Sequence, residues 1–306
     1  MAEPVLPPLY HASVANDLVE VKRLLEAGAD PNDGESIYHA AEKNHRAVIA
    51  LLIAYGGDIS GRHAVYDNTP LFFLCGHTDD DGGRAAWHQG IAYLLELGAD
   101  PNVTSSERDE TPLHQIATAP GATATAKLLL DRGANPLAPT ADGTTPYAVA
   151  VRNGNVDTAR LIAERGGAAT LTPEDDFLGA CRAGDEPRAR VLINDNPAFR
   201  ELLSKESTFA GTPLHWAAWN GQATGVRTLI ALGADVNVRD REFGSSPLGW
   251  AGHGSMACRA ADDDYCAVVD LLRAAGATRE ASINRWNETP ESMATPRVAA
   301  RLTRPL

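Results

Sequence analysis

The sequence predicts an all-α fold, a solenoid of stacked helix pairs that covers residues 1–306 as a single domain. Two recurring phrases predict it. "LLEAGADPN" at 24–32 returns as "LLELGADPN" at 94–102 and as "LIALGADVN" at 229–237. "TPLHQIA" at 111 returns as "TPLHWAA" at 212, upstream of the first phrase. The copies recur about every 33–34 residues, a period typical of repeats that stack on their neighbours.

Copies of the second phrase mark where each unit begins. Some are degenerate, such as "PPLYHAS", "ESIYHAA" and "DDFLGAC", but their Leu and Ala positions stay in phase. About eight helix-pair units are therefore expected, followed by a truncated C-terminal cap at 289–306. Their starts lie near residues 7, 35, 69, 111, 145, 175, 212 and 246.

The best-formed unit shows why each phrase forms a helix. Thr212 is suited to cap a helix N-terminus, and Pro213 is suited to the first helical position. Leu214 and Ala217 fall on one apolar face, and the alanine is small enough for a neighbouring helix to come close. Gly221 is expected to end the helix. A pair of such short helices cannot bury its own apolar face, so the core must come from stacking.

These residues resemble the ankyrin-repeat family over essentially the whole chain, and "TPLHWAAWNGQATGVRTLIALGADVNVRD" is the strongest match. The resemblance implies inner and outer helices joined by short β-turn fingers, with a concave groove that binds other proteins. It also implies that His114 and His215 bond the backbone of a finger. Cys75 and Cys181, in the inner helices, are expected to be small buried residues.

Composition narrows the class of function. Apolar residues make up 44% and charged residues 22% of the chain, as in ordered soluble proteins. The net charge of −13 argues against nucleic acid as a partner. No long apolar run or secretory leader is visible, and the four cysteines form no paired framework, so we expect a cytoplasmic, non-membrane, monomeric protein. The abundance of Ala, Gly, Asp and Arg suggests a bacterial source.

Two units are longer than the repeat, with insertions near 78–88 and 254–266 that each contain three aspartates. We expect these aspartates to begin the second helix of the unit, where negative charge suits the helix dipole. A functional loop is the alternative. A metal site of His253, Cys258 and Cys266 is conceivable, but the spacing is not that of a zinc site. Pro197 is expected to begin an extra helical turn.

Aromatic residues gather on the last units. Trp216 and Trp219 lie on the helix face opposite Leu214, and Trp250 and His253 follow them by 34 residues. We therefore expect exposed rings in the groove. Three residues before the unit starts, the fingers carry Phe209, Phe243 and Trp286, where earlier units carry Tyr66, Arg108, Asp142 and Thr172. The predicted binding residues, of which Arg182, Asn220 and His253 are the polar ones, are Arg182, Phe209, Trp216, Trp219, Asn220, Phe243, Trp250, His253 and Trp286.

The sequence thus predicts a non-enzymatic interaction module that binds a peptide or protein loop on a concave aromatic groove. No cofactor, metal or catalytic residue is predicted, because no familiar catalytic or phosphate-binding motif occurs. The alternative is a pocket for a small molecule or cation on the same groove, which could also serve an enzyme.

Overall fold

A computed structural model of the chain describes residues 6–63, 65–76, 83–257 and 260–304. Its helices are joined by turns and loops, and no residue of these ranges lies in a β-strand. The predicted all-α fold is therefore confirmed. The chain divides into two compact units. The single domain predicted for residues 1–306 stays a prediction, and each unit is described by itself.

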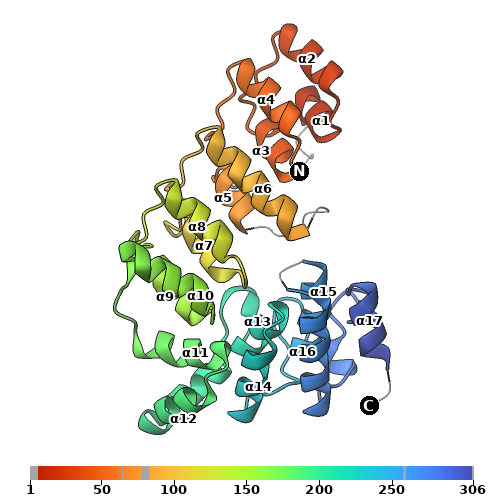
Figure 1. Ribbon diagram of the computed structural model, residues 1–306. Helices are drawn as coiled ribbons and strands as arrows, with labels where there is room; N and C mark the ends of the chain where they lie inside the picture. The colour runs from red at the N-terminus through yellow and green to blue at the C-terminus, as the bar shows by residue number, and fades with distance from the viewer. Residues whose placement is uncertain (1–5, 64, 77–82, 258–259, 305–306) are drawn as a thin grey trace. The chain divides into compact units, whose positions relative to one another are not determined.

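Unit 1 comprises residues 1–116 and 124–144. Short inner helices alternate with longer outer helices, and inner helices pack on inner ones (Figure 1). The helices are α1 (Pro8–Val14), α2 (Leu18–Glu26), α3 (Ser36–Glu42), α4 (Arg46–Ala54), α5 (Pro70–Gly76), α6 (Gly83–Glu96), α7 (Pro112–Thr118) and α8 (Thr123–Asp131).

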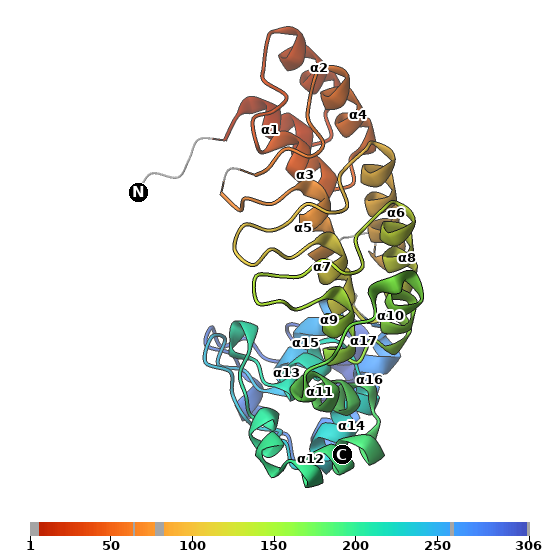
Figure 2. The ribbon, with the colours of Figure 1, turned by 90° about the vertical axis from the view of Figure 1, so that its left-hand side faces the viewer.

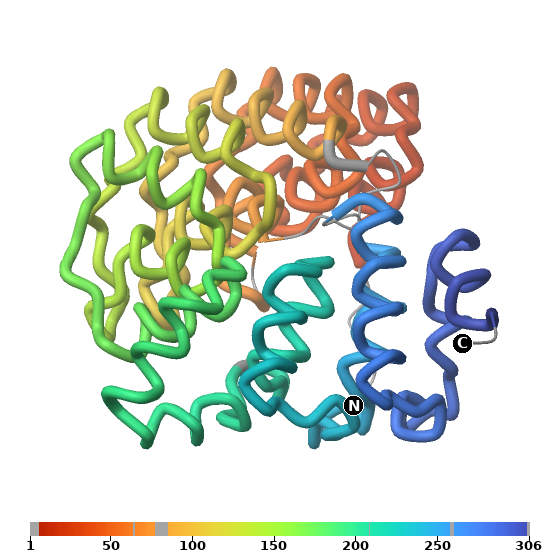
Figure 3. Tube along the Cα trace, turned by 60° about the horizontal axis from the view of Figure 1, so that its bottom comes forward, coloured from red at the N-terminus to blue at the C-terminus, as the bar shows by residue number. Residues whose placement is uncertain are grey.

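Unit 2 comprises residues 117–123 and 145–306. Its inner helices α13 and α15 lie side by side, as the teal and blue tubes of Figure 3 show. The α-helices are α9 (Pro146–Arg152), α10 (Val156–Ile162), α11 (Pro173–Ala183), α12 (Glu186–Asp195), α13 (Pro213–Trp219), α14 (Ala223–Ala231), α15 (Pro247–Met256), α16 (Asp262–Ala274) and α17 (Pro296–Thr303). The remaining helical segments are η1 (Ala163–Gly167), η2 (Pro197–Leu203), η3 (Thr208–Ala210) and η4 (Glu280–Ser282).

Fingers connect one helix pair to the next. Figure 2 shows the loops before α5 and α7 projecting to the same side of unit 1. The finger tips turn through a residue with left-handed backbone, such as Asp67 at φ 45° and Asp109 at φ 55°. Asp and Asn tolerate this conformation better than most non-glycine residues. The same turn in unit 2 uses Ala210 at φ 53° and Asn287 at φ 61°.

The predicted packing faces are confirmed in the core of unit 2. Leu214, Ala217 and Leu229 are fully buried between neighbouring helices, and Gly221 follows α13 at φ 65°. The two inner-helix cysteines are also buried as expected. Burial raises the pKa of Cys181 to about 12, so the thiol stays protonated at neutral pH.

One predicted unit start was wrong. The sixth unit begins at Thr172, not near residue 175, because Thr172 caps α11 by accepting a hydrogen bond from the Asp175 amide at 3.1 Å. Thr172 is therefore a helix cap and not a finger residue. The C-terminal cap has a turn after Thr289, and its α-helix starts at Pro296. The expected extra helical turn is confirmed as η2, which begins at Pro197.

The second insertion behaves as expected, because α16 begins with its three aspartates. Asp264 accepts a hydrogen bond from the Ala261 amide at 3.2 Å and so caps the helix. The aspartates of the first insertion and Cys258 of the conceivable metal site lie outside the described residues. Within the described ranges, no helix has the length and apolar content needed to cross a bilayer.

Candidate functional site

Two buried histidines tie inner helices to fingers. The Thr212 amide donates to His215 Nδ1 at 3.2 Å, and His215 Nε2 donates to the Ser245 carbonyl of the next finger at 3.1 Å. His114 repeats this pattern with the Thr144 carbonyl at 3.2 Å. Burial lowers the pKa of both histidines, which favours the neutral ring. The predicted structural role of these two residues is confirmed.

Eight rings of unit 2 form one connected group: the buried His215, whose centroid lies 5.1 Å from that of Trp250, and seven others, here called the C-terminal aromatic cluster. It consists of Phe209, Trp216, Trp219, Phe243, Trp250, His253 and Trp286. The finger residues form a row in which the Phe243 centroid lies 5.8 Å from Phe209 and 6.2 Å from Trp286. These separations fall within the range of attractive aromatic pairs. The structure thus brings together all the aromatic residues and the histidine that the sequence singled out.

Trp250 is the centre of this cluster and is not an exposed anchor, so that expectation was wrong. Its side chain is 5% exposed, and its ring lies 5.2 Å from Trp216 and 6.0 Å from Phe243. The indole N–H donates to Asp240 Oδ2 at 3.0 Å. A Cβ added to Gly211 would lie 2.7 Å from the Trp250 ring, so the finger fits closely over it. Trp250 is therefore the floor on which the other rings rest.

The rings around Trp250 are more accessible. Trp216 and Trp219 are half-buried, and the Trp216 indole N–H donates to Ser207 Oγ at 2.9 Å. Phe209 is 49% exposed and Trp286 is 60% exposed. The accessible part of the cluster therefore lies on the fingers and on the edges of the α13 tryptophans.

Of the three predicted polar residues, His253 is exposed, whereas Arg182 and Asn220 are 7% and 2% exposed and do not belong to an accessible surface. Arg182 donates to Asn153 Oδ1 at 2.6 Å and to Gln222 Oε1 at 3.1 Å, which joins the ends of three helix pairs. Both residues line a cavity of about 380 Å³ at the loops between inner and outer helices of unit 2. Asn220 Oδ1 accepts no hydrogen bond from the described residues.

Unit 1 contains a second ring group that the sequence analysis missed, here called the N-terminal aromatic cluster. It consists of Tyr10, His11, Tyr38, His39, His63, Tyr66 and Phe73. The signal was present, because His11, His39 and Phe73 lie four residues after their unit starts, as Trp216 and Trp250 do. Tyr66 is 61% exposed and His11 is exposed, whereas Tyr38 is 2% exposed. Burial raises the pKa of Tyr38 above its usual range.

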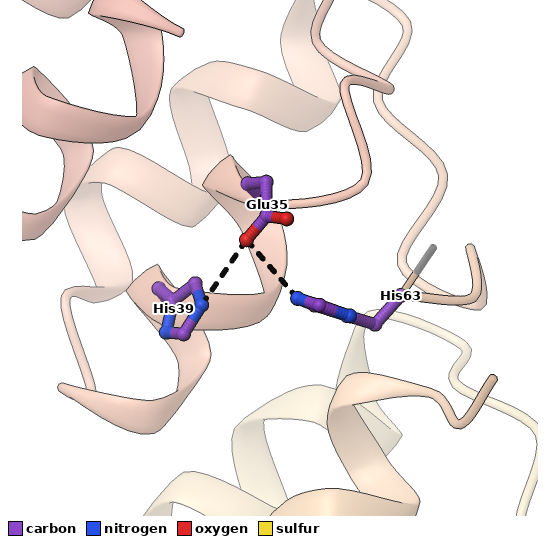
Figure 4. A group of neighbouring side chains, drawn as sticks. All are labelled: Glu35, His39 and His63. Atoms are coloured by element: carbon purple, nitrogen blue, oxygen red, sulfur yellow. Dashed lines mark hydrogen bonds and ion pairs between the residues drawn. The ribbon is translucent and has the colours of Figure 1, made fainter. Parts of the chain in front are cut away.

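Glu35 joins two histidines of this cluster (Figure 4). Its Oε2 lies 3.0 Å from His63 Nε2 and 3.3 Å from His39 Nε2. His63 Nδ1 accepts hydrogen bonds from the Val65 and Tyr66 amides at 3.1 and 3.3 Å. Since Nδ1 accepts, the His63 hydrogen is on Nε2, which donates to Glu35. His63 thereby ties a finger to the start of α3.

His39 lies between two carboxylates. Its Nδ1 is 2.7 Å from Glu42 Oε2, while its Nε2 faces Glu35. Both nitrogens can donate only when the ring is a protonated imidazolium.

Glu35, His39 and His63 form a group that could hold a metal ion, since their ligand atoms lie within 4.8 Å of one another. A metal-bound histidine usually donates its other N–H to an acceptor. His39 fits that rule through Glu42, but His63 does not, because its other nitrogen already accepts two backbone N–H groups. The two backbone N–H groups hold the ring in the form that carries its hydrogen on Nε2. Zinc could bind His63 Nε2 only by displacing that hydrogen.

Comparison with known proteins agrees with this architecture. Residues 83–173 match the family described as Ankyrin repeats (3 copies), and residues 211–241 match the family described as Ankyrin repeat. The human Ankyrin repeat and SOCS box protein 16 is 32% identical over 230 residues, which cover 69% of this chain and 47% of that protein. The human Ankyrin repeat and SOCS box protein 6 is 27% identical over 159 residues, 46% of this chain and 36% of that protein.

A longer but weaker match is the Ankyrin repeat and KH domain-containing protein mask-1 of Caenorhabditis elegans. It is 26% identical over 295 residues, 87% of this chain but 10% of that protein. The chain spans less than half the length of each of these relatives. These three relatives come from animals, so they give no support to the bacterial source that the composition suggested.

Proposed function

We propose that this chain, an ankyrin-repeat protein, binds an apolar segment of another protein on its C-terminal aromatic cluster. Repeats of this family generally mediate protein binding, and stacked repeats present extended surfaces suited to it. One observation carries the proposal. Phe209, Phe243 and Trp286 form a row of rings on neighbouring fingers, and its two ends are 49% and 60% exposed.

Energetics favour a binding role for this row. Contiguous exposed apolar surface costs free energy in water, and aromatic residues are the commonest anchors of protein interfaces. The row rests on the buried Trp250, and Asp240 bonds that indole as well as the Ser245 amide at 3.0 Å. Because burial and this hydrogen bond fix the Trp250 ring, less conformational entropy is lost when a partner binds to the rings above it.

The charge of unit 2 favours an apolar partner. Its residues include 20 aspartates and glutamates and 18 lysines and arginines, a net charge of −2. The cation-binding variant of the function is less favoured, because Arg285 already lies over Trp286, with Cζ 5.7 Å from the ring centroid. A small-molecule site is favoured by a different observation, the cavity at Arg182 and Asn220, which lies apart from the ring row.

A selection from a phage-displayed library of random peptides on the full chain tests the proposal. Selected peptides should be rich in apolar residues and should bind the Phe209→Ala/Trp286→Ala double variant at least thirtyfold more weakly. Loss of an anchor residue costs about 2 kcal/mol, which corresponds to that factor. Both residues are exposed, so the double variant should unfold at nearly the same temperature as the parent.

The matched control removes an exposed apolar side chain elsewhere in unit 2. Val191 on α12 is 58% exposed, and Val191→Ala should leave peptide affinity within a factor of two of the parent. The proposal fails if the selected peptides bind the double variant as tightly as the parent.

A further inference from the structure

The two units differ sharply in charge. Unit 1 contains 20 aspartates and glutamates but 9 lysines and arginines, a net charge of −11, whereas unit 2 carries −2. Most of the charge of −13 on the whole chain therefore belongs to unit 1. Such a field raises the local concentration of cations and speeds the approach of basic partners.

The N-terminal aromatic cluster lies within this acidic unit and is partly accessible. Tyr66 at the tip of a finger is 61% exposed, and Tyr10 and Phe73 on the inner helices are half-buried. The rings are continuous: Tyr10 lies 5.1 Å from His39, and His63 lies 4.6 Å from Tyr66. The surface therefore offers ring faces over the width of three helix pairs.

Carboxylates are interspersed with these rings. The Glu42 side chain is 33% exposed and the Glu35 side chain 16%, at either end of His39. The Asp67 side chain, next to Tyr66, is 53% exposed. Two basic side chains lie nearby: Lys43 Nζ is 3.7 Å from Glu42 Oε1, and Arg62 Nη1 is 3.6 Å from Asp67 Oδ1. Ring faces next to partly exposed carboxylates suit a guanidinium or ammonium group.

We propose that the N-terminal aromatic cluster is a second interaction surface, which binds an arginine- and lysine-rich segment of another protein. Charge complementarity identifies the partner, since the surface lies in a unit of net charge −11. Arginine side chains stack on the accessible rings and pair with Glu42 and Glu35. The same kind of contact already occurs inside unit 1, where Arg46 Cζ lies 5.1 Å from the Tyr93 centroid. This surface is independent of the apolar surface of unit 2.

Fluorescence anisotropy with a labelled peptide of alternating arginine and serine tests this surface on the full chain. Binding should weaken roughly tenfold between about 50 and 200 mM salt, because screening acts on exposed charges. Tyr66→Ala and Glu42→Gln should each weaken binding about fivefold at the lower salt concentration. A peptide of alternating glutamine and serine should not bind.

Unit 1 supplies a matched control for each variant. Tyr55 on the C-terminal cap of α4 is 39% exposed, and the Glu96 side chain on α6 is 61% exposed. Tyr55→Ala and Glu96→Gln remove the same groups elsewhere in unit 1 and should change affinity less than twofold. Equal losses from the control variants would show diffuse attraction by the net charge and would overturn the assignment. Failure of the arginine peptide to bind at low salt would overturn it as well.

Discussion

The two aromatic clusters are built on the same repeat positions but differ in chemistry. In the C-terminal aromatic cluster, indole and phenyl rings pack around the buried Trp250. One carboxylate, that of Asp240, accepts a hydrogen bond from the Trp250 indole. In the N-terminal aromatic cluster, tyrosines and histidines surround Glu35 and Glu42, so most of the side chains are polar or titratable. Repeat geometry decides where side chains gather, and residue type decides what the surface can recognise.

The largest effect on stability is expected from Trp250, the buried ring at the centre of the C-terminal aromatic cluster. Trp250→Ala should lower the free energy of unfolding by about 3–5 kcal/mol, because it removes a buried ring that four neighbouring rings contact. Trp286→Ala should change it by about 0.5 kcal/mol or less, since that ring is 60% exposed. Urea unfolding of both variants measures the difference. Similar losses from the two variants would mean that Trp286 is also part of the core.

A smaller effect is expected from His114 and His215, the buried histidines that tie inner helices to fingers. Burial lowers the pKa of His215 from its ordinary value of 6.5, so the unfolded chain binds the proton more readily than the folded one. This contribution to stability is complete above pH 6.5 and is lost as the pH falls through that value towards the lower folded pKa. Stability should therefore fall on acidification, and His215→Gln should reduce the slope.

Unfolding midpoints measured at several pH values between about 7.5 and 5 test this sign. The control is Val191→Ala, which changes an exposed residue of the same unit without removing a titratable group and should leave the slope as in the parent. A slope that stays unchanged in His215→Gln would contradict the assigned origin of the pH dependence.

The smallest effect is expected from zinc at the N-terminal aromatic cluster. His63 Nδ1 accepts backbone N–H groups, so its Nε2 keeps a hydrogen and is not free to ligate. A moderate excess of zinc should leave the thermal unfolding midpoint unchanged. A rise in the midpoint that disappears in both His39→Gln and His63→Gln would show instead that the finger backbone yields to the metal.

Much of the fold could be predicted from the sequence, because repeat period and capping residues act locally. Seven of the eight predicted unit starts lie one residue before an inner helix, as at Thr212 before α13. The sixth start was wrong because the Leu–Ala phrase was aligned without the Thr172–Pro173 cap, and α11 has 11 residues where α13 has 7. A longer helix shifts the cap relative to the apolar phrase.

The candidate site was harder to predict, because exposure depends on neighbouring units. Trp216 and Trp250 occupy the same position of successive repeats, yet one is half-buried and the other is 5% exposed. The difference arises from what surrounds each ring: Trp250 has Trp216, Trp219 and Phe243 within about 6 Å of its centroid. The N-terminal aromatic cluster was harder to predict because tyrosines and histidines, which also occur as ordinary polar surface residues, make up all of it except Phe73.

The histidine links bear on how freely the fingers can vary in evolution. His114 and His215 attach a finger through a main-chain carbonyl, an acceptor that every amino acid provides. Those fingers can exchange their side chains, and so acquire new partners, without losing attachment. His63 instead reaches from a finger to the Glu35 carboxylate, so either substitution breaks the link. The attachment of this finger therefore depends on two side chains, His63 and Glu35, which must be inherited together.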